Sequence, residues 1–424
     1  MRPIAFTLPS FALCLLLPVC NGQTAPQLVA PPTRVAPQKL VSDDLAAGDI
    51  YGAAVAVDRD VAVVASEYDD DNGTDSGSVW IYRYTDGSWN AEQKLKPGDG
   101  TTGDNFGRSV TIQGDVVAVG THWDDDQGSK SGSVYVFRYD GDTWVEEQKL
   151  LPIGGTTEDR FGNSVCLDGD VLGVCGWLAD PLAGASGAAW MFRYDGNSWV
   201  EEQKLAPIGG GQGDNFGRYI AISSGVAVIG AWKADPVGND SGAAYVFRFN
   251  GTSWVQEQEL NAPDGAAGDL FGWATGIDGR FIAVGSHADD DLGADSGSVY
   301  VFRRDRNEWV FEQKLLPSDG HAGGWFGYAL EVDQNQILIG ATANFAAAND
   351  PGSAYIFRRV NGAWKQVARL VPPDGAPQDK FGFHVAMHAS TALVGAWRDD
   401  DAGNDSGSAY IWTGTGQQSS RAKK

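Results

Sequence analysis

Residues 106–150 read FGRSVTIQGDVVAVGTHWDDDQGSKSGSVYVFRYDGDTWVEEQKL and open with the aromatic–glycine pair Phe106-Gly107. This pair recurs every 55 residues with no insertion or deletion, and a leucine keeps the same spacing, mostly at the end of a Glu-Gln-Lys-Leu motif. The pairs begin at Tyr51, Phe106, Phe161, Phe216, Phe271, Phe326 and Phe381, and the leucines are Leu40, Leu95, Leu150, Leu205, Leu260, Leu315 and Leu370. Seven copies at one period indicate a repeat architecture.

Each repeat is predicted to form four β-strands. In the copy quoted above these are residues 106–112, 116–121, 133–139 and 144–150. The second strand is apolar throughout, as expected of a strand buried on both faces, and the more polar fourth strand is expected to be outermost. Asp140-Gly141 is typical of a hairpin turn. Four-stranded units that cannot bury both faces alone predict a propeller or a β-solenoid.

The two ends of the chain decide between these architectures. The fourth-strand tryptophan, Trp144 in the quoted copy, occurs six times, and a seventh would fall at Ser419 in a polar tail. Gln38-Lys39-Leu40, in contrast, precedes the first aromatic–glycine pair without a blade of its own. Ring closure joins these two incomplete ends and removes exposed sheet edges. We therefore predict an all-β fold, a seven-bladed β-propeller over residues 35–413 in which residues 35–41 complete the last blade.

The segments outside the repeats have other predicted roles. Residues 1–22 begin with a positive charge, continue with the apolar run 11–19 and end in small and polar residues, as in a signal peptide. Residues 23–34 are expected to form a Pro-rich linker and residues 414–424 a polar tail. The protein is therefore expected to be secreted or displayed at the cell surface, with lipoprotein anchoring at Cys20 as the alternative.

The charge of the chain restricts its partners. The net charge of −24 argues against a nucleic-acid partner, which requires a basic surface. After the N-terminal segment no stretch approaches the run of about 18 apolar residues that a membrane span needs. We expect a monomeric propeller whose partner is an extracellular protein or a glycan.

Only two cysteines lie beyond the predicted signal peptide, Cys166 and Cys175. A hairpin turning at Asp168-Gly169 would place Cys166 opposite Val171 and Cys175 opposite Gly162. An offset of about four residues, roughly 13 Å at the rise of a strand, is too long for a disulfide. Both are predicted to be free thiols that fill apolar space.

The repeat resembles the FG-GAP repeat. Its Phe-Gly pair is followed by a strand ending Gly-Ala-X, as in Gly230-Ala231-Trp232, and then by Gly-X-Ala/Val-Tyr-X-Phe, and the resemblance covers about residues 35–412. The resemblance implies a propeller like the head of integrin α chains and of many bacterial exported proteins. Two departures stand out: other residues replace the proline of Gly-Ala-Pro, and a tight turn such as Gln113-Gly114-Asp115 replaces the calcium loop between the first two strands. Integrin-type calcium sites therefore cannot be transferred to these positions.

The loop between the second and third strands is acidic in four repeats, at residues 69–77, 124–132, 289–297 and 399–407. Closely spaced carboxylates next to a glycine suit a hard cation such as Ca²⁺. The alternative is a solvated loop whose Asp and Ser side chains bond to the backbone of the turn. The candidate Ca²⁺ ligands are Asp69, Asp71, Asp75, Asp124, Asp126, Asp289, Asp291, Asp295, Asp399, Asp401 and Asp405.

A second candidate site is the position directly after the second strand. It varies in chemistry while the neighbouring positions do not, which suits a ligand-binding surface near the central channel. Trp and His beside carboxylates would suit a sugar or a peptide, and the alternative is an aromatic residue of the core. The candidates are His122, Trp177, Trp232, His287 and Trp397, and Glu67 and Thr342 complete the ring.

No catalytic residue is predicted. Neither G-x-S-x-G nor H-E-x-x-H occurs, and aspartates in hydrated loop tips lack the burial that tunes a general acid. No cofactor other than Ca²⁺ is expected. We expect a non-enzymatic recognition or adhesion module that binds protein or other extracellular ligands through one propeller face. The alternative is a carbohydrate-binding propeller, and a propeller-fold hydrolase or lyase ranks third.

Overall fold

The structure is a computed structural model that describes residues 36–180, 184–343 and 349–414. The predicted signal peptide, the linker and the tail after Gly414 lie outside the described residues. All the regular elements in these three ranges are β-strands. The described residues therefore include no helix that could cross a membrane.

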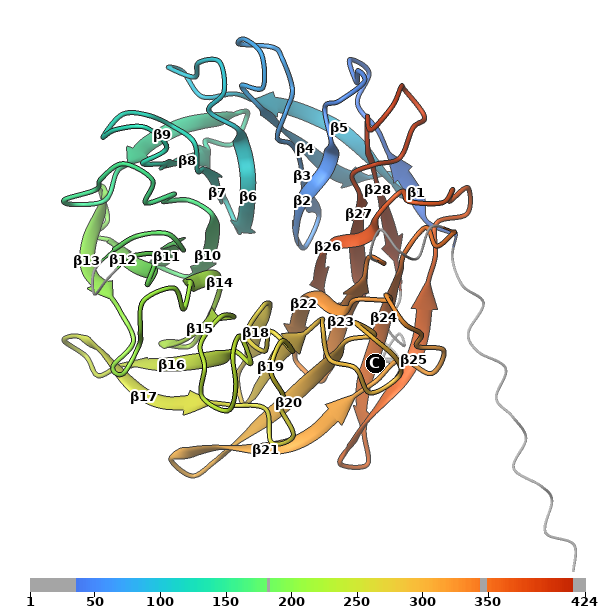
Figure 1. Cartoon of the computed structure of the whole chain (residues 1–424). Helices are drawn as coiled ribbons and strands as arrows, with labels where there is room; N and C mark the ends of the chain where they lie inside the picture. The colour runs from blue at the N-terminus through green and yellow to red at the C-terminus, as the bar shows by residue number, and fades with distance from the viewer. Residues whose placement is uncertain (1–35, 181–183, 344–348, 415–424) are drawn as a thin grey trace, which may run out of the picture. The chain divides into compact units, whose positions relative to one another are not determined.

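The strands form seven four-stranded antiparallel sheets arranged as the blades of a ring (Figure 1). In blades one to six the strands follow chain order from the channel to the rim, and the seventh has the order β26, β27, β28, β1. The first four blades are β2 (Tyr51–Asp58), β3 (Val61–Ser66), β4 (Ser78–Thr85) and β5 (Ser88–Leu95); β6 (Phe106–Gln113), β7 (Val116–Thr121), β8 (Ser133–Tyr139) and β9 (Trp144–Leu150); β10 (Ser164–Asp168), β11 (Val171–Gly176), β12 (Ala188–Tyr194) and β13 (Trp199–Leu205); β14 (Phe216–Ser223), β15 (Val226–Ala231), β16 (Ala243–Phe249) and β17 (Trp254–Leu260). The last three are β18 (Thr275–Asp278), β19 (Phe281–Ser286), β20 (Ser298–Asp305) and β21 (Glu308–Leu315); β22 (Phe326–Asp333), β23 (Gln336–Ala341), β24 (Ser353–Val360) and β25 (Ala363–Leu370); β26 (Phe381–His388), β27 (Thr391–Ala396), β28 (Ser408–Thr413) and β1 (Gln38–Leu40). The predicted seven-bladed propeller is confirmed.

The two ends of the ring differ in their connections. At one end the first strand begins, the second strand ends and the acidic loops lie; we call it the loop face. At the other end lie the hairpins between strands one and two and between strands three and four; we call it the hairpin face. In blade two, Phe106 pairs with Thr121 at the loop face and Gln113 pairs with Val116 at the hairpin face.

The aromatic–glycine pairs hold neighbouring blades together. The Phe106 ring is fully buried in a cluster that includes Val79 and Ile81 of the preceding blade, and it makes an edge contact with Tyr135 of its own blade at 5.6 Å between centroids. Successive blades also meet through their backbones, since Gly132 of blade two forms a parallel bridge with Phe161 of blade three. Gly132 has a φ of +83°, and a Cβ atom there would lie 2.0 Å from the Phe161 carbonyl oxygen. Only glycine allows the two backbones to approach so closely.

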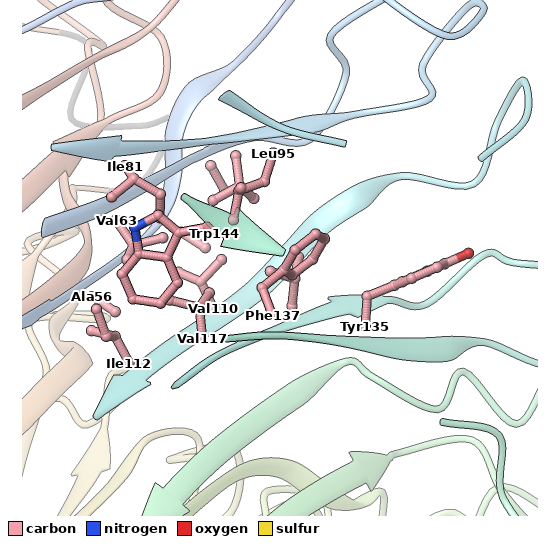
Figure 2. Packing of buried hydrophobic residues seen from close by; sticks show 14 of the residues in the cluster. Ala56, Val63, Ile81, Leu95, Val110, Ile112, Val117, Tyr135, Phe137 and Trp144 are labelled. Atoms are coloured by element: carbon pink, nitrogen blue, oxygen red, sulfur yellow. The ribbon is translucent and has the colours of Figure 1, made fainter. Parts of the chain in front are cut away.

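A second set of contacts joins the blades at the rim. The Gln93 side chain donates to the Trp144 carbonyl at 2.8 Å and accepts the Trp144 N–H at 2.8 Å. Figure 2 shows the Trp144 indole packed with Val63 and Ile81 of the preceding blade in one buried cluster. The same Gln–Trp pair occurs at six joints, between Gln38 and Trp89, Gln93 and Trp144, Gln148 and Trp199, Gln203 and Trp254, Gln258 and Trp309, and Gln313 and Trp364.

The N-terminal strand closes the ring. β1 pairs antiparallel with β28, and Gln38 lies opposite Ile411. Figure 1 shows β1 at the rim of blade seven, beside β28. Gln38 then contributes the Gln–Trp pair that binds blade seven to Trp89 of blade one. The predicted closure by residues 35–41 is therefore present over Gln38–Leu40.

The predicted cysteine register was wrong. Asp168 pairs with Val171, so Cys166 lies opposite Gly173 and Cys175 lies opposite Ser164. The physical reason is that Gly169, with a φ of +63°, takes the left-handed position of the turn and leaves Asp168 within the strand. Both thiols are free, as predicted. Burial raises the pKa of the Cys166 thiol to about 12.

Candidate functional site

The acidic loop of blade one is an ordered turn. Asp69 Oδ1 accepts the backbone N–H of Asp71 at 3.0 Å, and Asp70 Oδ1 accepts that of Asp75 at 2.8 Å. These bonds satisfy the backbone of the turn, as the alternative interpretation of the loop requires. Asp69 is only 5% exposed, so the first aspartate of the loop does not lie in a hydrated tip.

A lysine from the fourth strand lies among the carboxylates of this loop. The Lys94 Nζ is 2.7 Å from an oxygen of Asp44, 2.7 Å from one of Asp69 and 2.8 Å from one of Asp71. Burial lowers the pKa of Lys94, but hydrogen bonds to the three carboxylates outweigh it and raise that pKa above its ordinary value. We call this arrangement a lysine cluster.

A lysine cluster occurs in each of the four blades with a complete acidic loop. The lysine belongs to the Glu-Gln-Lys-Leu motif, and in blade seven it comes from β1. The clusters are Lys94 with Asp44, Asp69 and Asp71; Lys149 with Asp99, Asp124 and Asp126; Lys314 with Asp264, Asp289 and Asp291; and Lys39 with Asp374, Asp399 and Asp401.

The remaining blades differ at the same position. In blade three Lys204 lies over the ring of Trp190, with Nζ 4.6 Å from the centroid. Blade four has Glu259 there, and in blade six Arg369 pairs with Asp319 at 3.0 Å. Every complete acidic loop therefore has its lysine, as charge compensation requires, whereas Lys204 occurs without such a loop.

The lysine clusters bear on the predicted Ca²⁺ ligands. Asp44, Asp69 and Asp71 each offer an oxygen within 4.8 Å of the others, a spacing that suits a metal ion. Asp44 rather than Asp75 completes this group, and the Lys94 ammonium contacts all three carboxylates. A bound Ca²⁺ would have to displace that ammonium. Calcium binding by these loops stays a prediction.

The central channel holds a cavity at the axis of the ring. The innermost strands of all seven blades line a cavity of about 400 Å³. At mid-depth six of the seven lining residues are small or of moderate size, which leaves this space open. The seven mid-depth residues are Ala56, Thr111, Cys166, Ala221, Gly276, Glu331 and Ala386.

Aromatic rings from blades four to seven gather at the loop-face end of the channel, where Phe383 lines the cavity. Trp273 lies at their centre, with its ring centroid 5.1 Å from that of Trp232, 4.4 Å from His287 and 5.2 Å from Tyr328. Tyr328 is 5.2 Å from Phe383, which is 5.6 Å from Trp397. We call these residues the aromatic entrance: Trp232, Trp273, His287, Tyr328, Phe383 and Trp397.

Several polar atoms of the aromatic entrance have no hydrogen-bond partner. The indole N–H groups of Trp232, Trp273 and Trp397 are buried and unpartnered among the described residues, and so is Nδ1 of His287. His287 is only 4% exposed. Buried polar atoms are nearly always hydrogen-bonded in native proteins, so water or a ligand is expected to supply the partner of these atoms.

Two guanidinium groups lie beside the aromatic entrance and line the channel. Arg108 Nη1 is 3.6 Å from Glu67 Oε2, and Glu67 is 4% exposed. Arg218 stacks on two rings, with its Cζ 4.6 Å from the Trp273 centroid and 5.0 Å from that of Tyr219. Burial and the neighbouring Arg108 lower the pKa of Arg218.

The histidines near the entrance are neutral at neutral pH. Burial, and then the charge of Arg218, lowers the pKa of His287 to about 3. Burial, together with Arg108 and Arg218, lowers the pKa of His384 to about 4. The two arginines therefore supply the positive charge at this end of the channel.

A single carboxyl group projects from the mid-depth ring. Burial, together with Asp333 and Asp278, raises the pKa of Glu331 from its ordinary value of 4.5 to about 8. At neutral pH this group is largely protonated, so it adds little negative charge to the channel.

The predicted ligand residues fall into two groups. Trp232, His287 and Trp397 belong to the aromatic entrance. His122 instead lies 3.8 Å from the carboxylate of Glu67, and Trp177 lies beside Arg160, whose Cζ is 5.6 Å from its centroid.

Sequence reasoning missed the residues that join the first group. They occupy the position after each Phe-Gly pair, which is Ala53, Arg108, Asn163, Arg218, Trp273, Tyr328 and Phe383. This position varies in chemistry between repeats, just as the position after the second strand does. The same criterion applied to every position of the repeat would have found it.

The fold and the site together define a class, a seven-bladed β-propeller with a cluster of aromatic rings at the loop-face end of its channel. The model of the FG-GAP repeat matches residues 36–82, 89–137, 144–192, 199–247, 254–302, 309–357 and 364–412, and the chain belongs to this family. The crystal structure of Saccharomyces cerevisiae Sqt1 is similar at 11% identity and a TM-score of 0.47, covering 89% of this chain and 99% of that one. No curated protein matches the chain.

Proposed function

We propose that this protein is an exported, non-catalytic recognition module that binds its ligand at the aromatic entrance. The observation that carries the proposal is the gathering of rings with unpartnered buried polar atoms at the loop-face end of the channel. Concave sites lined by aromatic rings with a few polar groups are typical ligand sites. The membership of the FG-GAP repeat family supports a binding role.

The proposed location follows from the N-terminal segment and the family. Residues 1–22 have the pattern of a signal peptide. The ligand is then an extracellular protein or a glycan, met in solution or at a cell surface. The unpartnered indole N–H groups and the imidazole favour a glycan as the second, more specific candidate, because sugar hydroxyls both donate and accept hydrogen bonds.

The test is binding of the purified protein to a glycan array and to a panel of extracellular proteins. We expect Trp273→Ala to weaken the wild-type interaction by about tenfold or more. Val200→Ala is the matched control, since Val200 is half exposed at the rim in β13. A ligand that binds Trp273→Ala as tightly as the wild type would show that the aromatic entrance is not the site.

A further inference from the structure

The two arginines at the loop-face end of the channel differ in whether an ion pair with a carboxylate neutralises their charge. Arg108 forms an ion pair with Glu67 at 3.6 Å, whereas Arg218 forms no ion pair among the described residues and shares the field of Glu67 only at longer range. One carboxylate therefore serves two guanidinium groups in a protein with a net charge of −24. Burying an unpaired charge costs stability. Although the protein is rich in carboxylates, the Arg218 guanidinium has no ion pair among the described residues. An external anion could therefore bind to it.

The geometry of Arg218 suits this role. Trp273 and Tyr219 contact the guanidinium over their ring faces. Stacking uses the flat face of the group and leaves its N–H edge for hydrogen bonds, one of which goes to the Tyr328 side chain. The rest of that edge matches a carboxylate in a two-bonded arrangement. Arg108 lines the same cavity and influences Arg218 electrostatically.

The groups around Arg218 indicate the rest of the ligand. Tyr328 is buried and stacked on Trp325, whereas Trp273 is only partly buried. The exposed part of the Trp273 ring offers a surface against which the C–H groups of a sugar pack. The Trp232 and Trp273 N–H groups and the His287 Nδ1 are buried and unpartnered within the described ranges, and they suit hydroxyl groups.

We propose that the aromatic entrance binds an acidic carbohydrate, with the carboxylate of a sugar acid held by Arg218 and Arg108 and its ring placed against Trp273. This inference rests on the proposed function and names the class of ligand. It assigns Arg108 and Arg218 as the specificity-determining residues, which the candidate ligand ring at His122, Trp177, Trp232, His287 and Trp397 does not include.

The experiment compares a uronic-acid oligosaccharide with the methyl ester of the same oligosaccharide, by calorimetry on the purified protein. Physiological ionic strength is used, because charges beyond about 8 Å are then largely screened and the overall negative charge has little effect. We expect the wild type to bind the free acid about tenfold or more tightly than the ester. Arg218→Gln should lose this preference, and Arg218→Lys should recover part of it.

The control is Arg193→Gln, which removes the same charge from a pair with Glu202 in β12, away from the channel. It should keep the wild-type preference. Arg218→Gln should fold at least as stably as the wild type, because it removes an unpaired buried charge, and Arg108→Gln provides a second variant if it does not.

Four results would overturn the inference. Equal binding of acid and ester by the wild type would show that the site does not recognise the carboxylate. An unchanged preference in Arg218→Gln would show that Arg218 does not bind it. Arg218-dependent binding of a peptide carboxylate, with none of any oligosaccharide, would replace the carbohydrate by a peptide. Neutral glycan binding that depends on Trp273 but not on Arg218 would overturn this inference and leave the proposed function in place.

Discussion

Lys94 shows how single residues determine the character of the acidic loops. Its ammonium contacts Asp44, Asp69 and Asp71, which would otherwise repel one another. The position that sequence reasoning assigned to Ca²⁺ is thus shared with a cation that the chain itself supplies. Whether the metal competes with the lysine is a measurable question.

Replacing Lys94 distinguishes the role of its ammonium group from that of Ca²⁺. Lys94→Met leaves three carboxylates with oxygens within 4.8 Å of one another, so we expect a lower melting temperature than the wild type. Millimolar Ca²⁺ should then restore stability to the variant by more than it stabilises the wild type, since the ion takes the place of the ammonium. Melting curves in Ca²⁺ and in Na⁺ of matched ionic strength measure this difference.

Lys204→Met is the control, because Lys204 lies over Trp190 and has no cluster of three carboxylates. It should show no added response to Ca²⁺. A wild type that Ca²⁺ already stabilises far beyond Na⁺ would establish metal binding with the lysines in place. Equal curves in both salts for wild type and Lys94→Met would exclude a calcium role for this loop.

Because the pKa of Glu331 is raised in the folded protein, we expect the stability of the protein to depend on pH. Its folded pKa of about 8 exceeds the ordinary value of 4.5, so the folded protein holds a proton that the unfolded chain releases. The stability that this proton provides is complete below 4.5 and is lost progressively as the pH rises to about 8. Glu331→Gln should therefore melt higher than the wild type at about pH 9 and nearly equally at about pH 4. Melting curves that stay parallel across this range would contradict the pKa.

At the scale of elements, the three residues of β1 make the contacts that close the ring. Gln38–Leu40 pairs with β28, Gln38 contacts Trp89, and Lys39 contacts Asp374, Asp399 and Asp401. Deleting residues 35–41 should expose the edge of β28 and lower the melting temperature by several degrees or cause aggregation. Calorimetry and light scattering measure both effects.

A variant with Gln38→Ala and Lys39→Ala keeps the strand and removes these side-chain contacts. It should melt between the wild type and the deletion. An unchanged melting curve for the deletion would refute the closing role of β1.

The strands could be predicted because their signals are local. The apolar second strands and the Asp-Gly turns define Val116–Thr121 and Ser133–Tyr139, and both strands have the predicted bounds. The hairpin at Gly169 was misregistered, since the choice of the residue that takes the positive φ shifts every partner in the pair. The lysine clusters could not be predicted in this way, because Lys94 and Asp44 are far apart in the sequence and meet only through blade packing.

At the scale of the whole molecule, structural and binding residues occupy different positions of the repeat. The aromatic–glycine pairs and the Gln–Trp pairs recur around the ring and hold the blades in register. The position after each Phe-Gly pair varies instead, and it places Arg218, Trp273 and Tyr328 at one side of the channel. A ring of similar blades can therefore have an asymmetric site, because the residues that vary are not those that pack the blades together.

The pairing of β1 with β28 also fixes an order of events during biosynthesis. Gln38–Leu40 leaves the ribosome before any complete blade. Its partner residues Ala409–Ile411 are made only after the first six blades have been translated. Each earlier blade forms from neighbouring hairpins, whereas this last contact has the longest sequence separation in the ring and so the slowest expected closure. A chain that stops before the seventh blade leaves its first strand without a partner. Ring closure thus distinguishes a chain that contains all seven blades from one truncated before the seventh, and the nascent chain exposes unpaired edges until β28 has been made.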